Sequence, residues 1–363
     1  MSGRELASGP GGAIARRSRG LAARGLRLAE RLEDPRLPSA PLPHAGAFGA
    51  TALSADGRWV AAARSGSAQD RGLLLAALDG SGEVREALAD SWIRSVRFLG
   101  DETDLLAATQ QGEVVQIALD GERLIEVARR RCPAGAADPP RTVEVAPDGA
   151  FAAVLLGSGT IVGLPWPEGA PWSFDLRREL ANGSVARLAC AFEPAPAGKL
   201  AVVCDRVLVF DRSGSGGRLA SLAPDLAGGP SALCWSGSEL LVVEGAELLR
   251  VPLLGGGPRS RTLAAAGATD LGRAAISPGG RIIALHRSAH AGEIDLHAPT
   301  GEPLARRPAS PRGVEALAVA DDGRLAVAEA DGGLTVWAPG PAAEPLLRMR
   351  DRPREAGRPI AAG

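Results

Sequence analysis

Several residue types are scarce or missing from this chain of 363 residues. It has no tyrosine, its one asparagine is Asn182, and Lys199 is its single lysine, so the 41 basic residues include 40 arginines. Lysine, asparagine and tyrosine use AT-rich codons, and their scarcity indicates a GC-rich genome such as those of many bacteria. Much of the excess of Ala, Gly, Arg and Pro then reflects mutation pressure rather than function.

Cysteine is also sparse, with Cys132, Cys190, Cys204 and Cys234 in the whole chain and no CxxC pair. Secreted scaffolds stapled by disulfides are far richer in cysteine. A bridge between Cys190 and Cys204 is an alternative, because these two residues could lie on neighbouring strands. We expect all four instead to be small buried hydrophobic side chains.

Long apolar runs are missing as well. None approaches the roughly 18 residues of a membrane-spanning helix, and arginines at 19, 24 and 27 interrupt the sequence that an export signal would need. The Arg-rich opening is similar in composition to a mitochondrial transit peptide, although the GC bias weakens that hypothesis. The formal net charge of -1 gives no reason to expect nucleic-acid binding. We therefore predict a cytoplasmic protein.

Motifs for catalysis or cofactor binding are also missing. Around Lys199, Glu193 replaces the first glycine of a phosphate-binding loop and Leu200 replaces its hydroxyl residue, and no GxSxG nucleophile elbow occurs. His286 and His290 have a spacing that suits zinc on a helix. They fall in a predicted strand and loop, so we expect exposed loop histidines, with a metal site as the alternative. The sequence predicts no enzyme, no cofactor and no metal.

What the chain does contain is a repeat. Seven segments share one pattern: an apolar strand, a turn rich in Pro, Asp and Gly, and a second apolar strand. They are residues 50–63, 95–108, 141–156, 186–204, 231–243, 273–285 and 315–329. Third apolar segments follow at 72–80, 113–121, 206–211, 292–301 and 333–339, with more polar fourth segments such as 83–88 and 344–349.

The repeat predicts an all-β fold, a seven-bladed β-propeller of four-stranded antiparallel blades over residues 44–350. Turn signals every 8 to 10 residues interrupt the chain too often for helices. Continuous apolar strands fit blades that neighbours cover on both faces. An all-β array of another kind is the alternative. Because 344–349 can complete the last blade and 35–44 is proline-rich, we expect the ring to close without a borrowed N-terminal strand.

Two features resemble the WD40 family of propellers. One is the turn sequence of residues 54–58 and 320–324, and the other is the strand ending Val209-Phe-Asp211, with Val336-Trp337 in the same place. The Gly-His and Trp-Asp signatures of that family are missing, so its hydrogen-bonded tetrad cannot be transferred. The resemblance covers residues 48–349 and implies a rigid docking platform.

Two terminal segments stand outside the repeat. Residues 1–34 form a basic arm, within which Ile14, Leu21, Leu28 and Leu32 mark one stripe of a predicted amphipathic helix ending before Pro35. The arm is interpreted as a surface extension, as a docking helix for a partner, or as a contact for an anionic membrane or nucleic acid. Residues 351–363 are predicted to form a disordered tail.

By elimination, the sequence predicts a non-enzymatic scaffold that binds an unknown protein partner through the face carrying the connections between blades. The candidate contacts are Trp92, Arg94, Arg129, Arg130, Arg131, Arg206, His286 and Arg312. Core packing of Trp92 and solvated loops at the arginines are the alternatives. Two other functions stay open: a propeller enzyme of the lactonase or hydrolase type, and a propeller subunit of a bacterial conflict system with an AAA ATPase.

Overall fold

The computed structural model divides the chain into two compact units, Met1–Leu37 and Pro38–Gly363. All described residues belong to the second unit: 48–65, 71–100, 103–121, 123–133, 137–178, 189–194, 198–204, 206–211, 218–222, 231–245, 247–253, 258–263, 271–287, 292–330, 332–341 and 344–349. The predicted arm (1–34) and tail (351–363) lie outside these ranges. Within the ranges there is no helix with the length and hydrophobicity that a membrane crossing requires.

Seven antiparallel sheets of four strands, called blades 1 to 7 in chain order, make up this unit. Blades 1 to 3 contain β1 (Phe48–Leu53), β2 (Trp59–Ser65), β3 (Arg71–Ala77), β4 (Val84–Ala87); β5 (Ile93–Phe98), β6 (Leu105–Thr109), β7 (Glu113–Asp120), β8 (Arg123–Arg131); and β9 (Pro140–Val145), β10 (Phe151–Leu156), β11 (Thr160–Pro165), β12 (Trp172–Asp175), followed by the 3-10 helix η2 (Leu176–Arg178).

Blades 4 and 5 contain β13 (Ala189–Phe192), β14 (Leu200–Val203), β15 (Val207–Phe210), β16 (Arg218–Leu222); and β17 (Ala232–Ser236), β18 (Glu239–Glu244), β19 (Glu247–Pro252), β20 (Arg259–Thr262). Blades 6 and 7 contain β21 (Leu271–Ile276), β22 (Ile283–Arg287), β23 (Glu293–His297), β24 (Pro303–Pro308); and β25 (Val314–Val319), β26 (Leu325–Glu329), β27 (Leu334–Trp337), β28 (Pro345–Met349).

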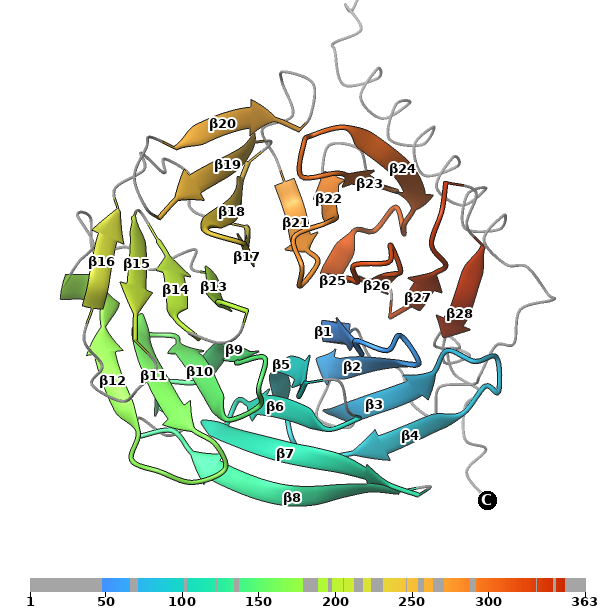
Figure 1. Cartoon of the computed structure of the whole chain (residues 1–363). Helices are drawn as coiled ribbons and strands as arrows, with labels where there is room; N and C mark the ends of the chain where they lie inside the picture. Colours follow the sequence, from blue (N-terminus) through green and yellow to red (C-terminus); the bar gives the residue numbers. More distant parts are fainter. Residues whose placement is uncertain are drawn as a thin grey trace, which may run out of the picture. The chain divides into compact units, whose positions relative to one another are not determined.

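The blades form a closed ring. Figure 1 shows the first strand of each blade near the centre and the fourth strand on the outside. Each first strand contacts the first strand of the next blade, and β25 of blade 7 contacts β1 of blade 1. Blade 7 is completed by its own β28, and Arg324 of blade 7 donates a hydrogen bond to the carbonyl of Gly57 in blade 1. The predicted propeller, and its closure without a borrowed strand, are confirmed.

The hydrophobic core lies between blades rather than within one of them. One cluster joins Leu75 of blade 1 to Leu105 of blade 2, and another joins Leu155 of blade 3 to Phe210 of blade 4. A third joins blades 7 and 1. The middle strands β6, β10 and β14 are buried along their whole length, which explains why their sequences are apolar throughout instead of alternating.

Two tryptophans of blade 3 help to join it to its neighbours, Trp166 to blade 2, where it donates to Gln116 Oε1 at 2.7 Å, and Trp172 to blade 4. Trp166 and Trp172 lie in a Pro-rich stretch that is equally compatible with packing and with exposure, and both side chains are buried. Trp172 stacks between Phe151 of its own blade and Phe210 of blade 4, with ring centres 6.2 and 6.0 Å away. Trp235 and Trp337 are also buried, whereas Trp59 is half-buried.

The Asp-Gly turns between first and second strands are held by their own side chains. Asp56 Oδ1 accepts hydrogen bonds from Arg58 N (2.9 Å) and from Ser54 Oγ (2.6 Å), and Asp322 Oδ1 accepts from Arg324 N at 3.0 Å. Gly57 has φ +66°, a left-handed conformation that glycine adopts without strain. These carboxylates are therefore turn formers, as predicted.

Arginines on the outer strands of four blades lie against the next blade. The guanidinium groups of three of them donate to backbone carbonyls in the third-to-fourth-strand connection of the following blade. The pairs are Arg85 with Gly121, Arg130 with Pro165 and Gly169, and Arg307 with Gly340 and Pro341. Arg261 lies in the corresponding place against Gly301, where a Cβ would stand 2.5 Å from its Nε. The planar, multi-donor guanidinium suits two carbonyls at once, so part of the arginine excess has a structural use.

Replacing Arg307 with methionine should lower the free energy of unfolding by about 1–3 kcal/mol, because its buried guanidinium loses the bonds to Gly340 and Pro341. The matched control is Arg306→Met on the same strand. Arg306 is 61% exposed and paired with Asp295, so its loss should cost less than about 1 kcal/mol. Urea denaturation measures both. Equal losses for the two variants would contradict the assigned tie.

Candidate binding surface

Five of the seven innermost strands carry a β-bulge at their second residue, at the face where these strands begin. In each case one extra residue interrupts the pairing with the second strand. The extra residues are Gly49, Arg94, Arg141, Gly272 and Glu315. Bulges redirect side chains and are frequent beside functional sites. Three of the five positions carry charged residues, which places charge at this end of the central channel.

A cavity of about 410 Å³ lies over the first strands of blades 1, 2 and 3 at this end of the channel. We call it the axial mouth. Its lining residues are Gly49, Ile93, Arg94, Pro139, Pro140, Arg141 and Gly157. Three of them are bulge residues of neighbouring blades, and the bulges of β5 and β9 each bring an arginine to it. The arrangement therefore combines two arginine residues with walls of Gly and Pro that leave the backbone close to any bound group.

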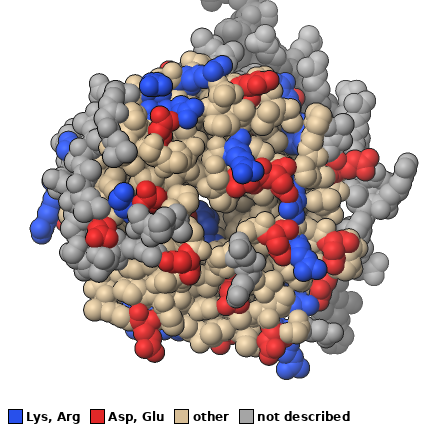
Figure 2. Space-filling model, in the orientation of Figure 1, with Lys and Arg blue, Asp and Glu red and all other residues tan. Residues whose placement is uncertain are grey.

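Arg97 and Arg273, which also lie on innermost strands, are paired with carboxylates. Arg97 on β5 makes hydrogen bonds of 2.5 and 3.1 Å with Glu144 on β9, and the charge of Glu144 raises the pKa of Arg97. Arg273 on β21 lies 3.5 Å from Glu315 on β25. Arg94 differs, because it is exposed and donates to the neutral Gln110 Oε1 at 3.1 Å. On the face drawn in Figure 2 the ring opens at its centre, basic atoms are visible in the opening, and acidic side chains are scattered around it.

Trp92 stands directly before β5 and is half-buried. The guanidinium of Arg71 lies 4.5 Å from the centre of its ring, a cation–π contact that covers one face of the indole. The Trp92 carbonyl accepts from Gln110 N at 2.7 Å. Trp92 therefore helps to hold Gln110, the residue that orients Arg94, while its role as a partner contact stays a prediction.

The predicted basic loop at Arg129, Arg130 and Arg131 is in fact a strand. The three residues form the end of β8, which pairs with β7 as far as Arg131 opposite Glu113. The prediction of a loop there is wrong because β8 is an outer strand, and its solvent side accommodates a run of arginines. Their contact with a partner remains a proposal.

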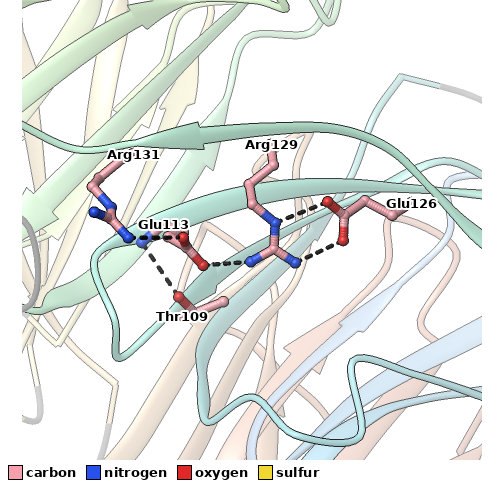
Figure 3. A network of polar contacts seen from close by, with 5 residues as sticks. All are labelled: Thr109, Glu113, Glu126, Arg129 and Arg131. Atoms are coloured by element: carbon pink, nitrogen blue, oxygen red, sulfur yellow. Dashed lines mark hydrogen bonds and ion pairs between the residues drawn. The ribbon is translucent and has the colours of Figure 1, made fainter.

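Much of the charge of this segment is balanced locally. Figure 3 shows Arg129 between Glu113 and Glu126, with hydrogen bonds of 2.8 and 2.6 Å to the two Glu126 oxygens. These bonds raise the pKa of Arg129 and lower that of Glu126. Arg130 is used in the tie to blade 3, and Arg131 lies 3.5 Å from Glu113 with 73% of its side chain exposed. Arg131 is thus the most accessible charge of the three.

The remaining sequence candidates are spread over blades 4, 6 and 7. Arg312 is exposed in the connection between β24 and β25, and Arg206 is half-buried before β15. His286 was expected to be exposed, and this is wrong: it lies in β22 and is 3% exposed, and His297 in β23 is 5% exposed. His290 is outside the described residues. Because its side chain is buried, His286 is not accessible to a partner.

Neither metal-binding clusters nor reactive thiols are found in the described ranges. No group of three or more His, Cys, Asp or Glu side chains there could hold a metal ion. The four cysteines are buried and free, as predicted. Burial raises the pKa of Cys132 to about 11 and that of Cys234 to about 12, so these thiols stay protonated and are poor nucleophiles at neutral pH.

His286 should make the fold sensitive to acid. Neither ring nitrogen has a hydrogen-bond partner among the described residues, and burial, followed by the charge of Arg273, lowers its pKa. In the unfolded chain the imidazole takes up a proton near pH 6.5, whereas the folded protein does so at a lower pH. Stability from this group is therefore lost as pH falls from about 6.5 to the folded pKa.

We expect His286→Leu to lose less stability than the parent chain on acidification, with a difference of up to about 1.4 kcal/mol per pH unit in that window. Urea denaturation at pH 7.5, 6.5 and 5.5 measures it. Parallel curves for the two proteins would show that His286 carries no such penalty.

Comparison with known proteins supports the fold. No protein-family model and no curated protein matches this sequence. Among solved structures, the chain is similar to the β-propeller domain of Cps50 (Swd1) from Myceliophteria thermophila, with a TM-score of 0.64 and 15% identity over 81% of this chain and 96% of that one. It is also similar to a chain of the mitotic checkpoint complex, with a TM-score of 0.62 and 16% identity over 84% and 93%. At such identities the likeness shows the seven-bladed propeller fold alone.

Proposed function

We propose that this chain is a non-enzymatic protein-interaction scaffold that binds an acidic segment of a partner protein at the axial mouth. The observation that carries the proposal is the pair of arginines, Arg94 and Arg141, which neighbouring bulges bring to one cavity. Carboxylates and phosphates are the groups that a guanidinium binds best, through two parallel hydrogen bonds.

The mouth is suited to binding because its parts are held in place before a partner arrives. Arg94 is oriented by Gln110, and Ile93 beneath it is buried in the core between blades 1 and 2. Pro139 and Pro140 restrict the backbone on the other side. Less conformational freedom is then lost on binding, which favours affinity. The solved structures to which the chain is similar support only its fold. One of them is a chain of the mitotic checkpoint complex by its title.

The other functions suggested by the sequence gain no specific support. A propeller hydrolase would need several catalytic polar groups gathered at one mouth of the channel, and the residues lining this cavity are two arginines, two prolines, two glycines and an isoleucine. Membership of a bacterial conflict system rests on the fold alone. Docking by the N-terminal arm, and contacts at Trp92, Arg206 and Arg312, remain predictions.

Fluorescence anisotropy with a labelled, end-capped octaglutamate peptide tests the axial mouth. Replacing Arg94 or Arg141 with Glu should weaken binding at least ten-fold, since each change removes one cation and adds a repelling anion. Binding should also weaken as salt is raised, because the mouth is open to solvent.

The matched control is Arg259→Glu on the exposed outer strand β20 of blade 5, which makes the same change in charge away from the mouth. Its affinity should stay within two-fold of the parent. If Arg259→Glu weakens binding as much as Arg94→Glu, or if neither mouth variant has an effect, the assigned site is wrong.

A further inference from the structure

Strand β8 differs from the outermost strands of the other six blades. It contains nine residues, whereas β4, β12, β16, β20, β24 and β28 contain four to six. At about 3.3 Å per residue, β8 extends for about 30 Å. No further strand pairs with its outer edge in the described part of the chain, because blade 2 ends with it. Backbone N–H and C=O groups on this edge are therefore available to another strand.

The same strand exposes apolar side chains. Among the described residues, three large apolar side chains are exposed: Ile125 (41%), Val127 (53%) and Leu304 (44%). Two of them stand two residues apart on β8. Val127 is the extra residue of a bulge, between the pairs Glu126–Ile117 and Ala128–Gln116. On each side of it, four residues of β8 pair regularly with β7. Other outer strands are protected by short length, by proline as in β24, or by polar sequence as in β20.

Charge decides which strand could pair with this edge. Arg123 and Arg131 are exposed at the two ends of β8. In an antiparallel pair of two copies centred on Val127, Arg123 of each copy would face Arg131 of the other, and a parallel pair would place every arginine beside its equivalent. Like charges directly opposite one another are destabilising. In both of these registers a second copy of this chain is therefore a poor occupant.

The chain's own ends are equally poor occupants. Residues 1–34 contain seven arginines and four acidic residues, so their charge has the same sign as the ends of β8. Residues 351–363 contain three arginines and two prolines, and proline cannot donate to a ladder. What fits is an extended segment of another protein, with β-branched side chains opposite Ile125 and Val127 and carboxylates opposite Arg123 and Arg131.

We propose that the outer edge of β8 is a second docking site, separate from the axial mouth, at which such a segment adds a fifth strand to blade 2. Main-chain hydrogen bonds would supply affinity, and the two apolar contacts and two terminal charges would supply specificity. This inference does not depend on the proposed function of the mouth.

A display library of random nine-residue peptides tests the site. It is first depleted on the Ile125→Lys/Val127→Lys double variant and then selected on the parent protein. Enriched peptides should carry β-branched residues at alternate positions and acidic residues towards both ends. A synthetic copy should bind the double variant at least ten-fold more weakly, and should slow amide exchange in residues 123–131 of the parent.

Two single variants serve as controls. Leu304→Lys changes the exposed apolar residue on β24, and Arg94→Glu disables the axial mouth; both should bind the peptide as the parent does. Because Ile125 and Val127 are exposed, the double variant should keep the thermal unfolding midpoint of the parent. The proposal is overturned if selection yields no peptide, if the double variant binds equally well, or if exchange slows elsewhere. Concentration-dependent dimers that the double variant abolishes would overturn it in favour of self-pairing.

Discussion

Apolar contact between the faces of neighbouring sheets is the interaction on which the rest of this molecule depends. No blade has a core of its own: Leu75 needs Leu105 of blade 2, and Leu155 needs Phe210 of blade 4. Burying these faces removes apolar surface from water, which is the dominant favourable contribution to folding. Because every sheet must be covered on both sides, the array has to close on itself. The contact of blade 7 with blade 1 completes the core that an open array would leave exposed.

That constraint also assigns roles to residue types. Towards the axis the strands crowd together, and small side chains such as Ala61 and Ala107 fill the space at 0% exposure. Towards the rim the sheets diverge, and arginines bridge from one blade to carbonyls of the next, as Arg307 does to Pro341. The ring thus has places where a long, planar, multi-donor side chain is useful.

Both proposed docking sites lie where the regular pairing of strands or the packing of sheets against one another ends. The axial mouth forms where bulges end the regular pairing of β5 and β9, so Arg94 and Arg141 come to a cavity instead of continuing the ladder. The β8 edge forms where blade 2 has its last strand and Ile125 has no neighbouring sheet to cover it. A rigid ring thus presents two surfaces of different chemistry, a pair of cations at the axis and an extended edge at the rim.

The sequence by itself determined the first two strands of each blade, the turn between them and the number of blades. A strand covered on both faces must be apolar throughout, and a tight turn needs residues such as Asp56 and Gly57. These are local requirements, visible within a dozen residues. It also identified Arg94 as a candidate contact. Only the tertiary structure decided that Arg141 joins Arg94 at one cavity, that Arg129 to Arg131 belong to a strand, and that His286 is buried. Those outcomes depend on bulges and on contacts between residues of neighbouring blades, about 40 positions apart in the sequence. A pattern within a dozen residues cannot predict them.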